Sequence, residues 1–138
     1  MNKATVKTIL LVSAVCLLAD AVSGWFLADL GSLASVVLSI LFLVYAGRYY
    51  GAEAINSRNS ALANTIVTGL GFLSQNALGG LITVFSFGVL SWIPGIFHTF
   101  ESALNIVFGI WQLVAWSQLK DAAQAQAAPV NVTPPPVA

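Results

Sequence analysis

Three ionisable side chains lie within or beside apolar stretches of this chain, where a charge is costly. Asp20 follows a long apolar run, and His98 and Glu101 are three residues apart near the start of the last one. A charge at the centre of a bilayer costs at least about 2.5–3.5 kcal/mol, so such residues are functional candidates by default. Two amides, Asn76 and Asn105, occupy neighbouring apolar runs. We predict that these five residues form one polar cluster inside the membrane.

Familiar metal and haem centres do not fit this set of residues. A bis-histidine haem site needs two histidines, and the chain contains one. A di-iron helix bundle needs repeated Glu-x-x-His pairs, whereas His98 and Glu101 occur once and in the reverse order. Asp20 could complete a single metal site with them, but no ligand spacing beyond helical adjacency supports one. We therefore predict no catalytic residues, no metal and no cofactor, and a chain that is not an enzyme.

A simpler interpretation of the ionisable residues stays open. Counted from the inner ends of their helices, Asp20 lies about 18 Å and Glu101 about 24 Å along the span. Both depths are close to the outer surface of a membrane, where water can solvate a charge. In that case the three side chains would be solvated residues with no further role.

The composition favours a membrane-embedded chain. Charged residues make up 7% and apolar residues 58% of the 138 residues, and the mean hydropathy is +0.87. A soluble domain usually carries about 25% charged residues. Four spans of about 20 residues use roughly 80 residues, which leaves no room for a separate catalytic domain. The net charge is zero and no basic cluster is present, so nucleic acid is not an expected partner.

The basic residues predict the direction of the spans. All five can be placed on one side of a membrane, whereas the gaps near residues 26–31 and 93–97 contain no Lys or Arg. Cationic loops are retained on the cytoplasmic face. The chain is therefore predicted to be an all-α, four-helix transmembrane antiparallel bundle with both termini cytoplasmic. The basic residues are Lys3, Lys7, Arg48, Arg58 and Lys120.

A membrane domain of residues 1–120 is predicted, followed by a disordered Ala/Gln/Pro-rich tail at 121–138. Pro and Gly interrupt helices, so Trp92-Ile93-Pro94-Gly95 is expected to form the outer turn. Residues 51–60 are expected to form a polar cytoplasmic loop. The spans are predicted at about 5–26, 30–48, 62–85 and 96–118.

The bounds of the third span stay open at this stage. Residues 61–92 contain no charged side chain, which is too long for one upright helix and too short for two spans. The helix could occupy 62–83, slide to 70–91, or extend through the whole stretch as a tilted helix.

The N-terminus also has features of a cleavable signal peptide. Two lysines precede an apolar core, and Ala19-Asp20-Ala21 matches a cleavage pattern. Against cleavage, the apolar run resumes and reaches Trp25, which gives it the length of a full span. Whether residues 1–21 are removed stays open, and their loss would leave the other three spans in the same orientation.

Each span carries one face of small and polar residues, at 100° per residue. Helices in lipid associate through small residues and interhelical hydrogen bonds, so these faces are expected to point into the bundle. The faces are Ser13, Cys16, Asp20 and Gly24; Gly31, Ser35 and Ser39; Thr65, Gly69, Phe72, Asn76, Gly79 and Thr83; and His98, Glu101, Ser102, Asn105, Gly109 and Gln112.

Two functions are compatible with these features. We expect a small multi-pass protein of the cell (inner) membrane of a bacterium or archaeon, acting as an accessory, assembly or scaffold subunit. Its partners would be the lipid bilayer and a second membrane protein or further copies of itself. The alternative is a small transporter or channel whose outer vestibule is lined by Asp20, His98 and Glu101. Proton-coupled carriers commonly place the titrating group near the midplane, and the inner half here contains no acid or histidine, which favours the first.

Overall fold

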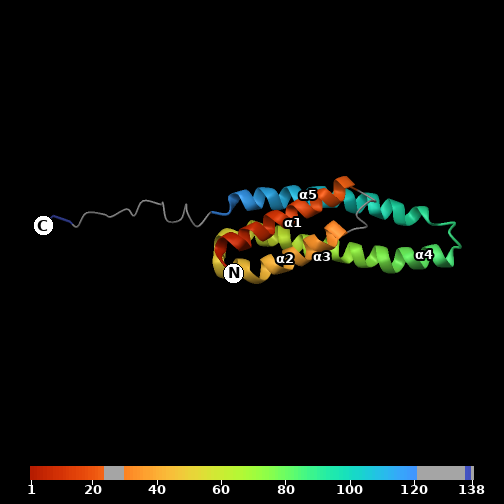
Figure 1. The fold of residues 1–138 in the computed structure, drawn as a ribbon, viewed down its shortest axis with the longest axis horizontal. Coiled ribbons are helices and arrows are strands. Elements are labelled where there is room, and N and C mark those ends of the chain that lie inside the picture. Colours follow the sequence, from red (N-terminus) through yellow and green to blue (C-terminus); the bar gives the residue numbers. More distant parts are fainter. Residues whose placement is uncertain (24–29, 121–135, 138) are drawn as a thin grey trace.

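The computed structural model describes residues 1–23, 30–120 and 136–137. Every regular element within these ranges is a helix, and four helices are long and apolar enough to cross a membrane (Figure 1). The prediction of an all-α chain with four such helices is confirmed to this extent. They are α1 (Lys3–Ser23), α2 (Leu30–Tyr49), the stretch Gly51–Phe85 and α5 (Trp92–Gln118). The stretch Gly51–Phe85 consists of the 3₁₀ helix η2 (Gly51–Ala54), α3 (Ile55–Ser74), the π-helical segment η3 (Gln75–Gly79) and α4 (Gly80–Phe85).

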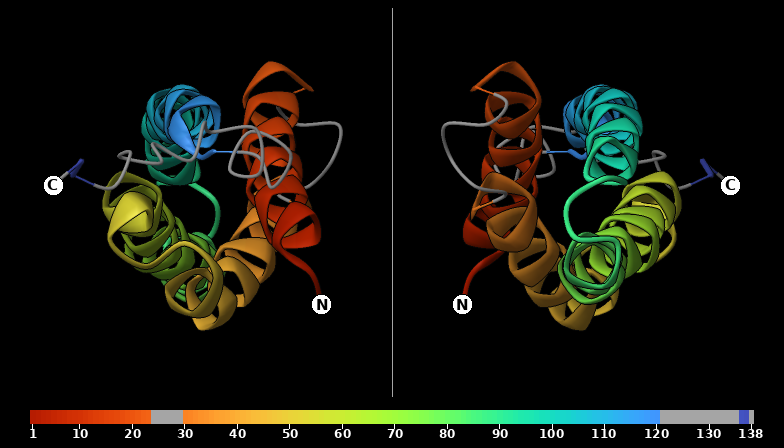
Figure 2. Two further views of the ribbon diagram at one scale, coloured as in Figure 1. Left: turned by 90° about the vertical axis from the view of Figure 1, so that its left-hand side faces the viewer. Right: turned by 90° about the vertical axis from the view of Figure 1, so that its right-hand side faces the viewer.

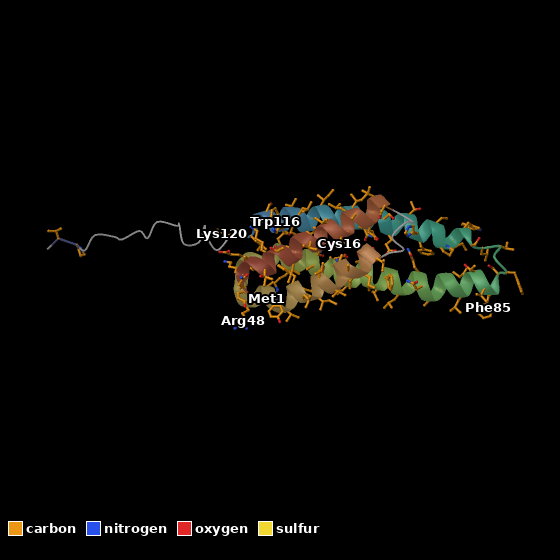
Figure 3. The ribbon with its side chains drawn as sticks, in the orientation of Figure 1. Met1, Cys16, Arg48, Phe85, Trp116 and Lys120 are labelled. Atoms are coloured by element: carbon orange, nitrogen blue, oxygen red, sulfur yellow. The ribbon has the colours of Figure 1, made fainter. Side chains whose placement is uncertain are left out.

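The four long helices form an antiparallel bundle in which each packs mainly against two others. α1 packs against α2 and α5, and α3 packs against the same two helices from the opposite side (Figure 2). Met1, Arg48, Trp116 and Lys120 lie together at one end of the bundle, and Phe85 lies at the other (Figure 3). We call these the cationic end and the far end.

Contacts between the chain termini close the bundle at the cationic end. Lys7 is only 9% exposed, and its Nζ donates a 2.7 Å hydrogen bond to the carbonyl oxygen of Leu119, just past the last turn of α5. The same ammonium lies 5.1 Å from the ring centroid of Trp116. The C-terminal end of a helix attracts positive charge. Lys7 therefore joins α1 to the end of α5.

The third helical stretch, Gly51–Phe85, begins earlier than any of the expected alternatives and ends before residue 91. Within it α3 begins at Ile55 directly after η2, so the expected polar loop at 51–60 is reduced to a single 3₁₀ turn. Gly51, with φ at 54°, lies where α2 ends. This positive φ is readily available to glycine and costly for residues with a Cβ.

The expected turn at residues 92–95 was wrong. The chain reverses at residues 86–91, where Phe87 and Gly88 have φ values of 52° and 83°. Pro94 instead lies in the first turn of α5. A proline is tolerated there because the first backbone N–H groups of a helix have no partner within it. The expected tail at 121–138 lies almost wholly outside the described residues, as do Gly24 and Trp25.

The helices differ in length in a way that shapes the molecule. α1 and α2 contain 21 and 20 residues, whereas α5 contains 27 and the stretch Gly51–Phe85 contains 35. At about 1.5 Å per residue, the short pair measures roughly 30 Å and α5 roughly 40 Å. α4 and the beginning of α5 therefore extend past α1 and α2 at the far end (Figure 1).

Burial follows an unusual pattern for a helical bundle. Near the cationic end the core is mostly apolar, and further along many of the buried side chains are hydroxyls and amides. Large aliphatic and aromatic side chains cover much of the outer surface. In a soluble bundle apolar residues occupy the interior. The apolar part of the core comprises Val6, Leu10, Phe42, Ala46, Tyr50, Ala54, Ala61 and Leu119.

Candidate functional site

The Asp20 carboxylate caps the N-terminus of a neighbouring helix. Asp20 is 4% exposed, and its Oδ1 accepts the backbone N–H of Gly31 at 3.1 Å. Its Oδ2 accepts the hydroxyl of Ser32 at 2.5 Å. Both residues belong to the first turn of α2, whose backbone N–H groups lack partners within the helix and whose dipole favours negative charge. Asp20 belongs to α1 but acts as a cap for the N-terminus of α2.

Gly31 makes this close approach possible. A Cβ atom on Gly31 would lie 2.6 Å from the Asp20 Cβ and 2.7 Å from the carbonyl oxygen of Cys16. Atoms do not come this close without a shift of the backbone. A glycine at this position therefore lets α2 begin directly against α1.

Asn105 brings α5 into the same group. Its Nδ2 donates to Asp20 Oδ2 at 3.2 Å and to the Ser32 hydroxyl at 2.8 Å. Two of the residues expected to cluster, Asp20 and Asn105, are thus in direct contact. Ser32 was missed in the sequence because the face of the second span was drawn through every fourth residue from Gly31, a row that contains Ser35 and Ser39 but not Ser32.

Hydrogen bonds continue from Asn105 toward the cationic end. The Thr68 hydroxyl lies 3.5 Å from Asn105 Oδ1 and donates to Asn64 Oδ1 at 2.8 Å. Asn64 Nδ2 in turn donates to the hydroxyls of Ser35 and Ser39 at 3.2 and 3.0 Å. All four residues beyond Asn105 are buried. We call this group, with Asp20 and Ser32, the polar ladder.

Ser39 is the junction of the polar ladder. Its hydroxyl accepts Gln112 Nε2 at 3.1 Å and lies 3.1 Å from the Ser13 hydroxyl. Side chains from α1, α2, α3 and α5 therefore meet at one point. Interhelical hydrogen bonds of this kind hold membrane helices together, so the polar ladder accounts for the packing of the bundle.

Glu101 lies in a different setting from Asp20. It is 7% exposed, and Gln75 Nε2 donates a short hydrogen bond to its Oε2. Gly71 is a close neighbour of the carboxylate, because a Cβ there would lie at an ordinary contact distance of 3.6 Å from Glu101 Oε1. Gln75 is a partner that the sequence did not reveal. His98, three residues earlier on α5, is half-buried.

The remaining expected member, Asn76, is placed elsewhere. Its side chain is exposed, and its Nδ2 donates to the carbonyl oxygen of Phe72 in its own helix at 2.8 Å. Within residues 1–23 and 30–120, no three His, Cys, Asp or Glu side chains gather closely enough to hold a metal ion. The described contacts divide the expected cluster, with Asp20 and Asn105 in the polar ladder and Glu101 beside Gln75.

A cavity of about 380 Å³ lies beside Glu101, between α3, η3 and α4 on one side and α5 on the other. Its wall is mostly apolar. Among the described residues that line it, Glu101 is the one with an ionisable side chain. The apolar wall includes Val67, Leu78, Ile82, Phe97, Phe100 and Leu104.

Comparisons with protein-family models, curated proteins and solved structures found no match to this chain. Two features thus bear on function. The polar ladder holds the helices together. The cavity combines an apolar wall with a buried carboxylate, which is the composition of a small-molecule site.

Proposed function

We propose that this chain is a multi-pass integral membrane protein without catalytic activity, and that it acts as an accessory or assembly subunit of a membrane complex. The observation that carries the proposal is the apolar surface of α4 and the following turn, which extend past α1 and α2 (Figure 1). Val84, Phe85 and Phe87 are 70, 79 and 96% exposed. Exposed apolar patches of this kind mark interaction surfaces.

Membrane insertion is supported by the distribution of side chains. The buried polar side chains are mostly hydroxyls and amides, whereas many large apolar side chains are exposed on the outer surface of the bundle. α1 and α2, at roughly 30 Å, match the hydrocarbon core of a bilayer. All five basic residues lie near the cationic end, which we therefore place in the cytoplasm together with both termini. A cell (inner) membrane of a bacterium or archaeon is the expected location.

A protein partner would complete the surface at the far end. α5 is roughly 10 Å longer than the short helices, so the turn after α4 lies beyond a core that α1 and α2 span. The apolar side chains of this turn therefore lie outside the hydrocarbon core and do not contact the lipid tails. A second membrane protein, or another copy of this chain, would cover them.

Copurification tests the proposal. The chain is purified from its own host in mild detergent, and the mass of the native assembly is measured. We expect a partner in fixed stoichiometry that is lost from the Val84→Ser/Phe87→Ser variant. The matched Val44→Ser variant changes an exposed residue of α2 near the cationic end and should retain the partner. Recovery of only a monomer from both detergent and nanodiscs would contradict the proposal.

A small transporter or channel is the second candidate, and the cavity is the observation that favours it. Asp20 is engaged in capping α2, so an outer vestibule would be lined by Glu101, with His98 one turn away, rather than by all three residues. A homo-oligomer that purifies without a partner and is stabilised by its substrate would favour this candidate.

A further inference from the structure

We propose that the cavity beside Glu101 binds a small amphiphilic amine in its protonated form. The ammonium group would contact the Glu101 carboxylate, and a single alkyl or aryl body would occupy the apolar space between α3, α4 and α5. This inference goes beyond the proposed accessory role and does not depend on a protein partner.

The size and wall of the cavity define the body of the ligand. A volume of about 380 Å³ is near the lower limit of small-molecule pockets, which span about 300–1,000 Å³. The wall is formed by aliphatic side chains such as Leu78 and Ile82 and by the rings of Phe97 and Phe100. These features suit one short hydrocarbon body rather than the two chains of a phospholipid.

The charge of the cavity defines the head of the ligand. Glu101 is 7% exposed, and it is the one ionisable side chain among the described residues that line the cavity. A carboxylate has about four acceptor positions, so a bound ammonium can share it with Gln75. Phenylalanine rings also attract cations.

The π-helical segment is an independent sign of a binding site. Such segments are rare, and they occur frequently at functional sites. η3 begins at Gln75, the hydrogen-bond donor to Glu101, and ends at Gly79. A Cβ on Gly79 would lie at an ordinary contact distance of 3.5 Å from the Pro94 ring, so this wall of the cavity lies close to the start of α5. The wide turn thus supplies both a polar partner and part of the wall.

Ligand-dependent stability of the full chain tests the proposal. The protein is reconstituted into nanodiscs of phosphatidylcholine, and its Tm is followed during titration with octylammonium chloride or with 1-octanol. A ligand that binds the folded state raises Tm as its concentration increases. We expect octylammonium to raise Tm and octanol to have little effect. In Glu101→Gln, which retains the shape of the side chain, the affinity for octylammonium should fall at least about tenfold, because a charge-assisted contact is lost.

Two tryptophan variants test the location of the site. Leu78 and Leu81 are 57 and 52% exposed, so both positions tolerate a larger side chain. Leu78 lines the cavity and Leu81 does not. Leu78→Trp should weaken octylammonium binding, whereas Leu81→Trp should leave it unchanged. A photoreactive octylammonium should label residues of the cavity wall, and excess octylammonium should prevent this labelling.

Three results would overturn the proposal. The first is an equal response to octylammonium and octanol. The second is unchanged octylammonium binding by Glu101→Gln. The third is that the protein retains phosphatidylethanolamine from mixed-lipid nanodiscs and that octylammonium does not displace this lipid. That result would identify the occupant of the cavity as a membrane lipid. Loss of a protein partner in the copurification experiment would affect none of these readouts.

Discussion

At the scale of single residues, Asp20 is a buried carboxylate that is stabilised without a nearby basic side chain. A helix N-terminus, one hydroxyl and one amide provide its partners. Oriented backbone N–H groups and the helix dipole can stabilise an anion in this way. The side chain is therefore a structural link between α1, α2 and α5.

Substitution of Asp20 should distinguish its hydrogen bonds from its charge. Asp20→Asn retains one acceptor oxygen and should cost about 1 kcal/mol, whereas Asp20→Leu leaves buried donors without partners and should cost about 2–3 kcal/mol. Thermal unfolding in detergent measures both. Glu53→Gln, at an exposed acidic residue, is the control and should change little. Equal effects of the Asn and Leu variants would show that the hydrogen bonds contribute nothing.

Coupling between residues of the polar ladder can be measured directly. Asp20→Asn and Ser32→Ala affect the same hydrogen bonds, so their combined effect on the free energy of unfolding should differ from the sum of the single effects by about 0.5 kcal/mol or more. The same cycle between Asp20→Asn and Glu101→Gln should be close to additive, because the two carboxylates have different partners. Strong coupling in this second cycle would restore the single cluster expected from the sequence.

A pair of glycine variants tests the approach of α1 and α2. Gly31→Ala places a Cβ 2.6 Å from Asp20 Cβ and should destabilise the bundle. Gly47→Ala, in the same helix, meets no atom within 4 Å and should be neutral or stabilising by up to about 1 kcal/mol, because alanine is the better helix former. Similar Tm values for the two variants would contradict the contact.

The face of the helix that is buried in the bundle was predicted from the sequence for α5 but not for α3. The face through Glu101, Asn105 and Gln112 is buried as expected. On α3 the positions Thr65, Gly69, Phe72 and Asn76 have the same spacing as Asn64, Thr68, Gly71 and Gln75. Both rows contain small and polar residues, so periodicity alone does not choose between them. Contact with α2 and α5 selects the second row.

At the scale of elements, α5 depends on a residue from the other end of the chain. Lys7 donates to the carbonyl oxygen of Leu119 at 2.7 Å and contacts the Trp116 ring. Lys7→Met should lower the free energy of unfolding by about 1–3 kcal/mol, since a hydrogen bond from a charged donor is lost. Lys120→Met, at an exposed lysine of the same end, should have little effect. The comparison is made by thermal unfolding in one detergent.

The observed helix ends show which residues of the sequence correctly marked the end of a helix and which did not. The charged and tyrosine-rich residues near position 48 predicted the end of α2 well. Pro94 was wrongly interpreted as a turn residue, because a proline in the first turn of a helix does not interrupt that helix. Ser86-Phe87-Gly88, where the chain reverses, contains a glycine with positive φ, but an isolated glycine among apolar residues is a weak turn signal.

At the scale of the whole molecule, the proposed orientation can be tested with single cysteines. Cys16 is the one cysteine of the chain, so Cys16→Ala provides a cysteine-free background. Glu53→Cys in η2 and Ser91→Cys in the far turn both replace exposed residues. In intact cells a membrane-impermeant maleimide should label Ser91→Cys, and it should label Glu53→Cys only after the membrane is opened. The reverse pattern would invert the orientation.

The four long apolar helices could be predicted because they depend on the composition along the chain. The pairing of buried residues could not, since it depends on which helices become neighbours and how far each extends. Glu101 and Asp20 were expected together from their similar depth. They instead meet different helices, Gln75 of η3 and Ser32 of α2.

The link between Lys7 and Leu119 has a consequence for the order of the chain. Because α1 and α5 touch, and α1 begins and α5 ends at the cationic end (Figure 3), the α1–α2 hairpin and the α3–α5 hairpin form a closed ring in space. A short linker from Lys120 to Lys3, with new termini opened in η2, would yield a circular permutant in which the second hairpin is synthesised first. We expect each helix of the permutant to pack against the same neighbours. The folded bundle should therefore not depend on which hairpin is inserted into the membrane first.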